Sequence, residues 1–270
     1  MIMVTLTSSV MIIAQESKET IGLTPAIQDN SFFIEEAFNQ EAGVVQHIFN
    51  ATYFTSPQKD YVLTFTQEWP LFSQMHQLSA TVPYAFLNSN TFNGIGDILL
   101  NYRYQLSAPE QWATVAPRIS VIFPVGSSSN GTGTGSAGLQ INLPVSKQLS
   151  PSFIVHFNVG VTHLPNVKAT DAVGKEIQRA LTSYNIGSSI IWLAHTNINV
   201  LLEWVDNFTH DIDDKGNFVS ATEVVVNPGL RCAIDMNSLQ IVPGIGIPIS
   251  MSRGDTRVGT FLYLSFEHPF

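Results

Sequence analysis

Ser128 and Ser129 are the first residues in this chain whose neighbours suggest catalysis. The sequence Ser128-Ser129-Asn130-Gly131 copies part of a motif of some lipid hydrolases, in which a histidine stands two residues before the nucleophilic serine. No histidine precedes either serine at that spacing, and the glycine-rich surroundings are typical of a loop. Because a serine needs an adjacent base to become a nucleophile, the sequence favours a non-catalytic loop. His156 and Asn158 share one face of an extended segment, where a histidine is more often structural than catalytic.

Two further motifs suggest a bound ion or phosphate, and both are incomplete. The segment Asp211-Ile212-Asp213-Asp214-Lys215-Gly216 is similar to a calcium loop, but Lys215 occupies a ligand position and no glutamate stands at the twelfth place. The glycine-rich stretch 126–136 does not end in Gly-Lys-Ser or Gly-Lys-Thr, as phosphate loops do. Cys232 is the single cysteine, which excludes a disulfide within the chain and offers no zinc spacing. We therefore predict no cofactor and no metal site.

The remaining candidates are ionisable side chains that alternate with apolar ones. In the stretch 94–106, Ile98, Leu100 and Tyr102 alternate with polar residues that include Asp97 and Arg103. This period of two is the pattern of a strand with one apolar and one polar face. The same pattern places nine ionisable side chains on the polar faces of predicted strands: Glu68, Asp97, Arg103, Arg118, His156, Glu203, Glu223, Arg231 and Glu267. Each of them must meet water or pair with a neighbour, since an unpaired buried charge is costly.

Twelve segments with this alternation follow one another to the end of the chain. We predict strands at about 46–55, 60–69, 77–86, 94–106, 114–123, 139–146, 153–162, 184–192, 198–204, 223–234, 239–249 and 258–270. Short turns alternate with longer or glycine-rich connections at 88–93, 126–136, 165–180 and 207–221. A short helix is expected near 173–180, and Pro117 should interrupt the fifth strand because proline cannot donate to the ladder.

The composition bounds the class of protein. The chain has 270 residues, of which 44% are hydrophobic and only 12% charged, about half the charged share of a soluble domain. Its net charge is −9 with only 12 lysines and arginines, which argues against a nucleic-acid partner. No apolar run of about 18 or more residues occurs, so membrane-spanning helices are not expected.

The apolar faces of the strands need either a second sheet or lipid, and the pattern favours lipid. Strands of about 9 to 11 residues suit a tilted membrane crossing, whereas soluble strands average about 5 to 6. Short turns at one rim, long loops at the other and an even strand number are typical of outer-membrane barrels. An arginine on the lipid face costs about 2 to 4 kcal/mol near the midplane, so Arg103, Arg118 and Arg231 fix the register. We predict an all-β fold, a single transmembrane antiparallel β-barrel of about 12 strands whose polar faces line the lumen.

The residues before the barrel are expected to form two regions. Residues 1–14 are predicted to be a signal segment, although they lack a positively charged start. Residues 15–45 should form a linker and a short helix, with Ser31 as its cap. Such a helix would lie beside or inside the mouth of the barrel formed by residues 46–270 and would narrow its lumen.

The last strand ends the chain on an aromatic residue. Leu262, Leu264 and Phe266 alternate toward Phe270, a pattern that resembles the C-terminal signal read by the assembly machinery of bacterial outer membranes. Pro269 departs from the usual form of that signal. The expected partners are therefore outer-membrane lipid, the assembly machinery through this strand and a small-molecule solute, in the outer membrane of a Gram-negative bacterium.

Three segments of the chain resemble one family of barrels. Residues 34–48 (IEEAFNQEAGVVQHI), residues 94–106 (GIGDILLNYRYQL) and the final phenylalanine are similar to outer-membrane proteins grouped with the meta-pathway of phenol degradation, often labelled transporters. The resemblance covers most of residues 31–270 and implies a channel without catalytic residues to carry over. The expected function is passive or facilitated passage of small solutes, hydrophobic or aromatic ones among them. The alternatives are an outer-membrane lipid hydrolase, a non-conducting structural barrel, or a soluble all-β protein if the chain is not exported.

Overall fold

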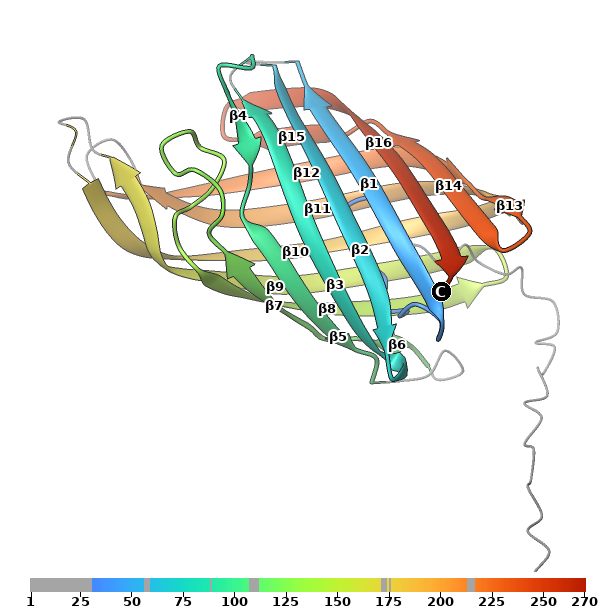
Figure 1. Cartoon of the computed structure of the whole chain (residues 1–270). Coiled ribbons are helices and arrows are strands. Elements are labelled where there is room, and N and C mark those ends of the chain that lie inside the picture. Colours follow the sequence, from blue (N-terminus) through green and yellow to red (C-terminus); the bar gives the residue numbers. More distant parts are fainter. Residues whose placement is uncertain are drawn as a thin grey trace, which may run out of the picture.

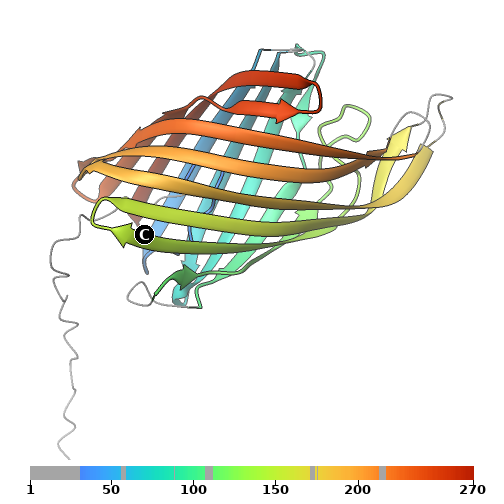
Figure 2. The same cartoon turned by 180° about the vertical axis from the view of Figure 1, so that it is seen from behind.

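The barrel closes through hydrogen bonds between its first and last strands. The structure is a computed structural model and describes residues 31–55, 59–87, 89–106, 112–170, 174, 176–212 and 217–270. Val44–Phe54 (β1) pairs antiparallel with Asp255–Pro269 (β16) along its whole length. Neighbouring strands are antiparallel throughout, and the closed sheet contains 12 strands (Figures 1 and 2). The predicted all-β barrel is therefore confirmed.

Four of the strands are each interrupted once, so that the sheet consists of sixteen segments. In chain order they are β1 (Val44–Phe54), β2 (Asp60–Leu71), β3 (Ser73–Leu87), β4 (Phe92–Ile95), β5 (Ile98–Tyr104), β6 (Thr114–Val115), β7 (Arg118–Phe123), β8 (Gly138–Ser150), β9 (Phe153–Thr170), β10 (Glu176–His195), β11 (Ile198–Ile212), β12 (Phe218–Cys232), β13 (Ile234–Met236), β14 (Leu239–Gly246), β15 (Ile249–Ser252) and β16 (Asp255–Pro269). None of the described residues belongs to a helix long and apolar enough to cross a membrane.

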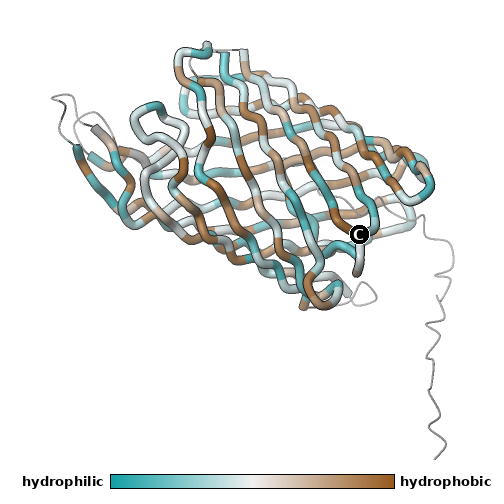
Figure 3. The backbone as a smooth tube through the Cα atoms, in the orientation of Figure 1, coloured by the Kyte–Doolittle hydropathy of each residue, from teal (hydrophilic) through white to brown (hydrophobic). Residues whose placement is uncertain are grey.

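Alternate residues of the strands form an apolar outer surface. On β16, Leu262 is 51% exposed, whereas its neighbours Phe261 and Tyr263 are 2% and 3% exposed. Figure 3 shows hydrophobic and hydrophilic positions following one another along the strands. Large exposed apolar side chains occur on strands all around the barrel, among them Phe49, Leu63, Leu100, Ile119, Ile141, Phe157, Ile190, Leu202, Leu230 and Ile245. An apolar belt on a closed barrel faces lipid.

An arginine introduced on this surface should destabilise the barrel. Leu262 lies in the middle of β16 and points outward, so Leu262→Arg should lower the free energy of unfolding by about 2 to 4 kcal/mol. The matched control is Leu106→Arg, because Leu106 is 58% exposed and follows the end of β5. Denaturant unfolding of both variants in lipid vesicles measures the difference. Equal losses at the two positions would contradict a lipid-facing belt.

Two of the predicted long loops are instead continuations of strands. β9 and β10 extend through most of the segment 165–180, so the loop and the short helix predicted there are wrong. β11 and β12 likewise extend through most of the segment 207–221. A continued ladder pairs the backbone N–H and C=O groups that a long loop would leave to water. The resulting hairpins project beyond the rest of the barrel (Figures 1 and 2). Residues 213–216 of the segment that is similar to a calcium loop lie outside the described residues.

The strand predicted at 94–106 is broken between β4 and β5. Pro83 on β3 lies opposite the break: its carbonyl accepts a hydrogen bond from the Gly96 amide at 2.8 Å, but it has no N–H to donate in return, and its ring lies against Gly96. Asp97 therefore leaves the ladder instead of lying on the face of a continuous strand. The interruption predicted at Pro117 is confirmed, since this proline lies between β6 and β7.

Residues 31–43, here called the inner segment, run through the interior of the barrel before β1. Their backbone forms bends and a turn, so the short helix predicted after Ser31 is wrong. They contact strands on opposite sides of the barrel, as shown below, and therefore cross its lumen. The predicted signal segment 1–14 and the linker residues up to 30 lie outside the described residues.

Candidate functional site

The barrel wall provides hydrogen-bond acceptors for the backbone of the inner segment. The carboxylate of Glu203 on β11 accepts from the amides of Phe33 and Ile34 at 2.8 and 3.2 Å. Four further amides of the inner segment, at Glu35, Ala37, Asn39 and Gln40, donate to the side chains of Asn158, Ser146, Gln105 and Gln77 at 2.7 to 2.9 Å. These bonds explain the missing helix, because the amides that a helix would pair internally are paired with the wall.

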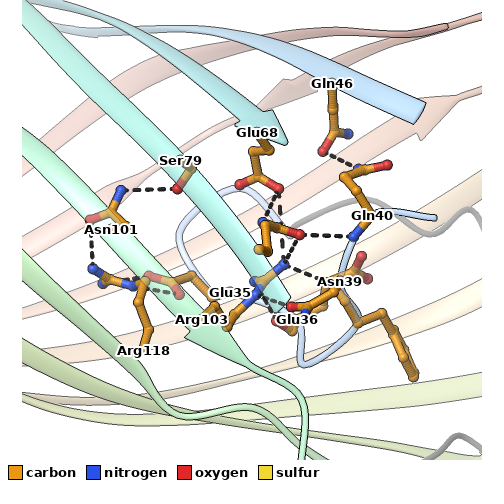
Figure 4. A network of polar contacts seen from close by, with 12 residues as sticks. Glu35, Glu36, Asn39, Gln40, Gln46, Glu68, Ser79, Asn101, Arg103 and Arg118 are labelled. Carbon is orange, nitrogen blue, oxygen red and sulfur yellow. Dashed lines mark hydrogen bonds and ion pairs between the residues drawn. The ribbon is translucent and has the colours of Figure 1, made fainter. Parts of the chain in front are cut away.

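Arg103 on β5 holds the other end of the inner segment through its carbonyl groups. Its guanidinium donates to the carbonyl oxygens of Glu36 and Phe38 at 3.0 and 2.7 Å and to the Asn39 side chain at 2.8 Å (Figure 4). The Glu68 carboxylate lies 3.9 Å away on β2. Arg103 is only 4% exposed, so this buried charge is satisfied jointly by the wall and by the inner segment.

Arg118 on β7 forms an ion pair with Glu35 in the middle of the inner segment. One Nη atom lies 2.6 Å from the Glu35 carboxylate, and Nε donates to the other oxygen of that carboxylate at 2.9 Å. The remaining N–H groups donate to Asn101 at 3.0 Å, to Gln140 at 2.8 Å and to Ser120. All five donors of the guanidinium are therefore used within the protein.

The Glu35 carboxyl should make the attachment of the inner segment sensitive to acid. Burial by itself raises the pKa of Glu35, but the adjacent Arg118, together with Arg103 and Asn142, outweighs burial and lowers the pKa below its ordinary value of 4.5. A lowered pKa means that the ionised carboxylate stabilises the folded arrangement above the ordinary value, and that this stabilisation is lost as the pH falls through the lowered pKa.

We expect channel conductance to rise below pH 4.5 in the intact protein and to respond less in Glu35→Gln. Conductance in planar bilayers as a function of pH measures this difference. Glu41→Gln is the control, because Glu41 is exposed at the end of the inner segment and should leave the acid response unchanged. An identical pH response of the intact chain and Glu35→Gln would contradict a role of the ion pair.

An aromatic side chain anchors the start of the inner segment. The ring of Phe32 lies 5.0 Å from that of Phe261 and 5.5 Å from that of Tyr263, both on β16. Gly229 on β12 and Gly244 on β14 make room for it, since a Cβ atom at either position would lie 2.5 or 2.8 Å from the Phe32 ring. The wall is therefore shaped to receive this ring.

Six of the nine predicted site residues surround the inner segment. They are Glu68, Arg103, Arg118, His156, Glu203 and Glu267, which contact the segment or a side chain bonded to it. Glu267 accepts from the Gln40 side chain at 3.2 Å, and the His156 ring meets the edge of Phe38 with centroids 6.5 Å apart. A seventh predicted residue, Arg231, is also buried: it lies on β12, two residues after Gly229, and is 1% exposed.

Asp97 and Glu223 lie away from this cluster. The Asp97 carboxylate accepts from the amides of Gly126 and Thr134 and from the Thr134 hydroxyl, at 2.7 to 3.1 Å. It therefore folds the glycine-rich loop 126–136 against the break between β4 and β5. Glu223 on β12 pairs with Arg257 on β16 at 3.0 Å.

The serine and histidine candidates do not form an accessible catalytic pair. The Ser129 hydroxyl bonds to the Ser127 hydroxyl at 3.0 Å in the glycine-rich loop. His156 does bond to a serine, Ser146, at 2.6 Å, but that hydroxyl also accepts from the Ala37 amide. Ser146 and His156 are 1% and 2% exposed, so the inner segment occupies the space that a substrate would need.

Sequence reasoning did not select the neutral members of the cluster as site residues. Gln77, Ser146, Asn158 and Ser189 bind the inner segment, the last through the Ser31 hydroxyl at 2.8 Å. Their only sequence signal is a position on the polar face of a strand, which they share with many side chains that do not touch the segment.

Two cavities adjoin the inner segment. The smaller has a volume of about 230 Å³ and the larger, here called the vestibule, about 450 Å³. Phe33, Glu35 and Arg118 line both, so the ion pair lies at their common border. The vestibule includes Phe54, at the end of β1 far from the C-terminus, and therefore lies toward the rim opposite Phe270.

Comparisons with known proteins identify the fold but no close relative. No protein-family model and no curated protein sequence matches the chain. Among solved structures, the COG4313 outer membrane channel from Pseudomonas putida F1 superposes with a TM-score of 0.65 at 9% identity, over 87% of this chain and 98% of that one. The NanC porin superposes with a TM-score of 0.51 at 9% identity, over 83% of this chain and all of that one. The fold is that of outer-membrane β-barrel channels.

Proposed function

We propose that the protein is an outer-membrane channel through which small solutes pass, and that the inner segment narrows its lumen. The observation that carries this proposal is the arrangement inside the closed barrel, where a polar segment crosses the lumen between two cavities. A polar interior that serves only structure needs no such cavities, whereas a selective channel needs a constriction with space on both sides. Passage requires no covalent chemistry by the chain.

The site residues enter this proposal as parts of the solute path. Arg118 borders both cavities, Glu68 and Arg103 line the smaller one, and Glu223 lines the vestibule. Membership of the family grouped with the meta-pathway of phenol degradation rests on the sequence resemblance, as does the expectation of hydrophobic or aromatic solutes. Assembly through the strand that ends at Phe270, and export by a signal segment at 1–14, belong to the same proposal.

Purified protein in planar bilayers tests the function. Unheated protein should first migrate differently from boiled protein on a denaturing gel, as a folded barrel does. We then expect discrete conductance steps and flux of small solutes. A folded barrel without either would be a structural barrel, and lipase activity that is lost in Ser128→Ala or Ser129→Ala would favour the hydrolase instead.

A further inference from the structure

The lining of the vestibule is polar, but each of its charged side chains is already paired within the protein and not with a solute. Ten of its lining residues have amide or hydroxyl side chains, and three have acidic or basic ones. Arg118 uses all five of its N–H donors inside the protein, two of them on Glu35. Glu223 is paired with Arg257 and also accepts from the Ser250 hydroxyl. An ion entering the vestibule would lose hydration without gaining an opposite charge, which is costly.

Two amide oxygens converge above a glycine in the vestibule wall. A Cβ atom at Gly160 on β9 would lie 2.4 Å from Asn185 Oδ1 on β10 and 3.1 Å from Asn142 Oδ1 on β8. Asn142 is 4% exposed, and its Oδ1 accepts no hydrogen bond from any residue that the structure describes. The Asn142 oxygen itself is enclosed by the protein, whereas Asn185 is only half-buried and lines the vestibule, so the Asn185 amide oxygen can accept a hydrogen bond from a solute hydroxyl.

Aromatic rings complete the site. Phe33, from the inner segment, and Phe54, from β1, line the same space as the amides of β8 and β10. Rings beside neutral hydrogen-bonding groups suit a molecule with an apolar C–H face and several hydroxyls. The volume of about 450 Å³ lies within the range of about 300–1,000 Å³ found for small-molecule sites.

We propose that the vestibule selects uncharged, polyhydroxylated solutes of the size of a monosaccharide or disaccharide, with a hydroxyl group donated to the Asn185 amide oxygen above Gly160. This inference rests on the proposed channel function and names its class of cargo. It departs from the expectation of hydrophobic or aromatic solutes, which rests on the sequence resemblance alone.

Swelling of liposomes that contain the full chain tests the selectivity. D-glucose should enter about tenfold faster than D-glucuronate, which has nearly the same size and one negative charge; a factor of ten corresponds to about 1.4 kcal/mol. Equal rates for glucose and glucuronate would overturn the inference and leave the channel intact. Absence of flux for every solute, from a barrel that is folded by gel mobility, would instead overturn the proposed channel function.

Two variants test the site itself. Gly160→Ala should displace the Asn185 oxygen, and Asn185→Leu should remove it at similar volume; each should raise the glucose concentration that half-blocks ion current about fivefold. Gly94→Ala is the matched control, because its new Cβ would lie 3.6 Å from Thr132 in ordinary contact and outside the vestibule. Glucose block that is unchanged in both site variants, or equally weakened in the control, would overturn the site.

Discussion

A chain that lacks residues 31–40 should conduct ions severalfold better than the intact protein in planar bilayers. The deleted residues cross the lumen and bond to wall side chains on β3, β5, β7, β8, β9, β10 and β11. Their removal joins the two cavities that Phe33 and Glu35 now border. The barrel should persist, since its ladder closes through β1 and β16 without these residues.

Gel mobility shows whether the shortened chain still folds as a barrel, and single-channel recordings measure its conductance. A folded barrel with unchanged conductance would show that the inner segment is not the constriction. Phe32→Ala provides an intermediate case, because it removes the ring held between Gly229 and Gly244 and keeps the rest of the segment. Its conductance should lie between those of the shortened and intact chains.

Arg103→Met should destabilise the folded arrangement by about 3 to 5 kcal/mol, the usual cost of removing one member of a buried ion pair. The substitution leaves the buried Glu68 carboxylate without its cation and frees the carbonyl groups of Glu36 and Phe38. We therefore expect both a lower denaturation midpoint and frequent transitions to a higher conductance level. The reason for the second effect is that Arg103 is a main attachment of the inner segment.

A double variant and a surface variant control this prediction. Arg103→Met combined with Glu68→Gln removes the uncompensated carboxylate, so stability should recover in part while the high conductance level remains. Arg253→Met, in the exposed turn before β16, should change neither property. Full recovery of both properties in the double variant would show that the carbonyl contacts of Arg103 contribute little.

The barrel itself was predictable from the sequence because its signal is local. Leu262 and Tyr263 are neighbours in sequence, and the period of two assigns them to opposite faces, as the structure has them. The interruption at Pro117 was predictable for the same reason, since it depends only on the missing amide of that proline.

The inner segment was not predictable because its partners are distant. The amide of Phe33 bonds to Glu203, which is 170 residues away, and no local pattern distinguishes that contact from a capped helix. Short apolar spacing after Ser31 favoured a helix, but a helix would have left the acceptors of the wall without donors. Competition between internal and wall hydrogen bonds decided the conformation.

The projecting hairpins and the break at Asp97 were missed for related reasons. β9 to β12 extend beyond the apolar belt, where neither face of a strand meets lipid, so the alternation that marks a strand is lost although the backbone ladder continues. Asp97 continues the alternation of its segment. Its role depends on the glycine-rich loop 126–136, because its carboxylate accepts a hydrogen bond from the amide of Gly126, which is 29 residues later in the sequence.

The inner segment is joined to the wall through a single peptide bond, between Gly43 and Val44, and the Gly43 carbonyl also accepts from the Phe270 amide at 3.0 Å. A segment that detached from the lumen would therefore remain tethered at the mouth of its own barrel. Its effective concentration there would be in the millimolar range, as for other short flexible tethers. Closure would be unimolecular and independent of protein concentration, and a free peptide of the same sequence would compete only at millimolar levels.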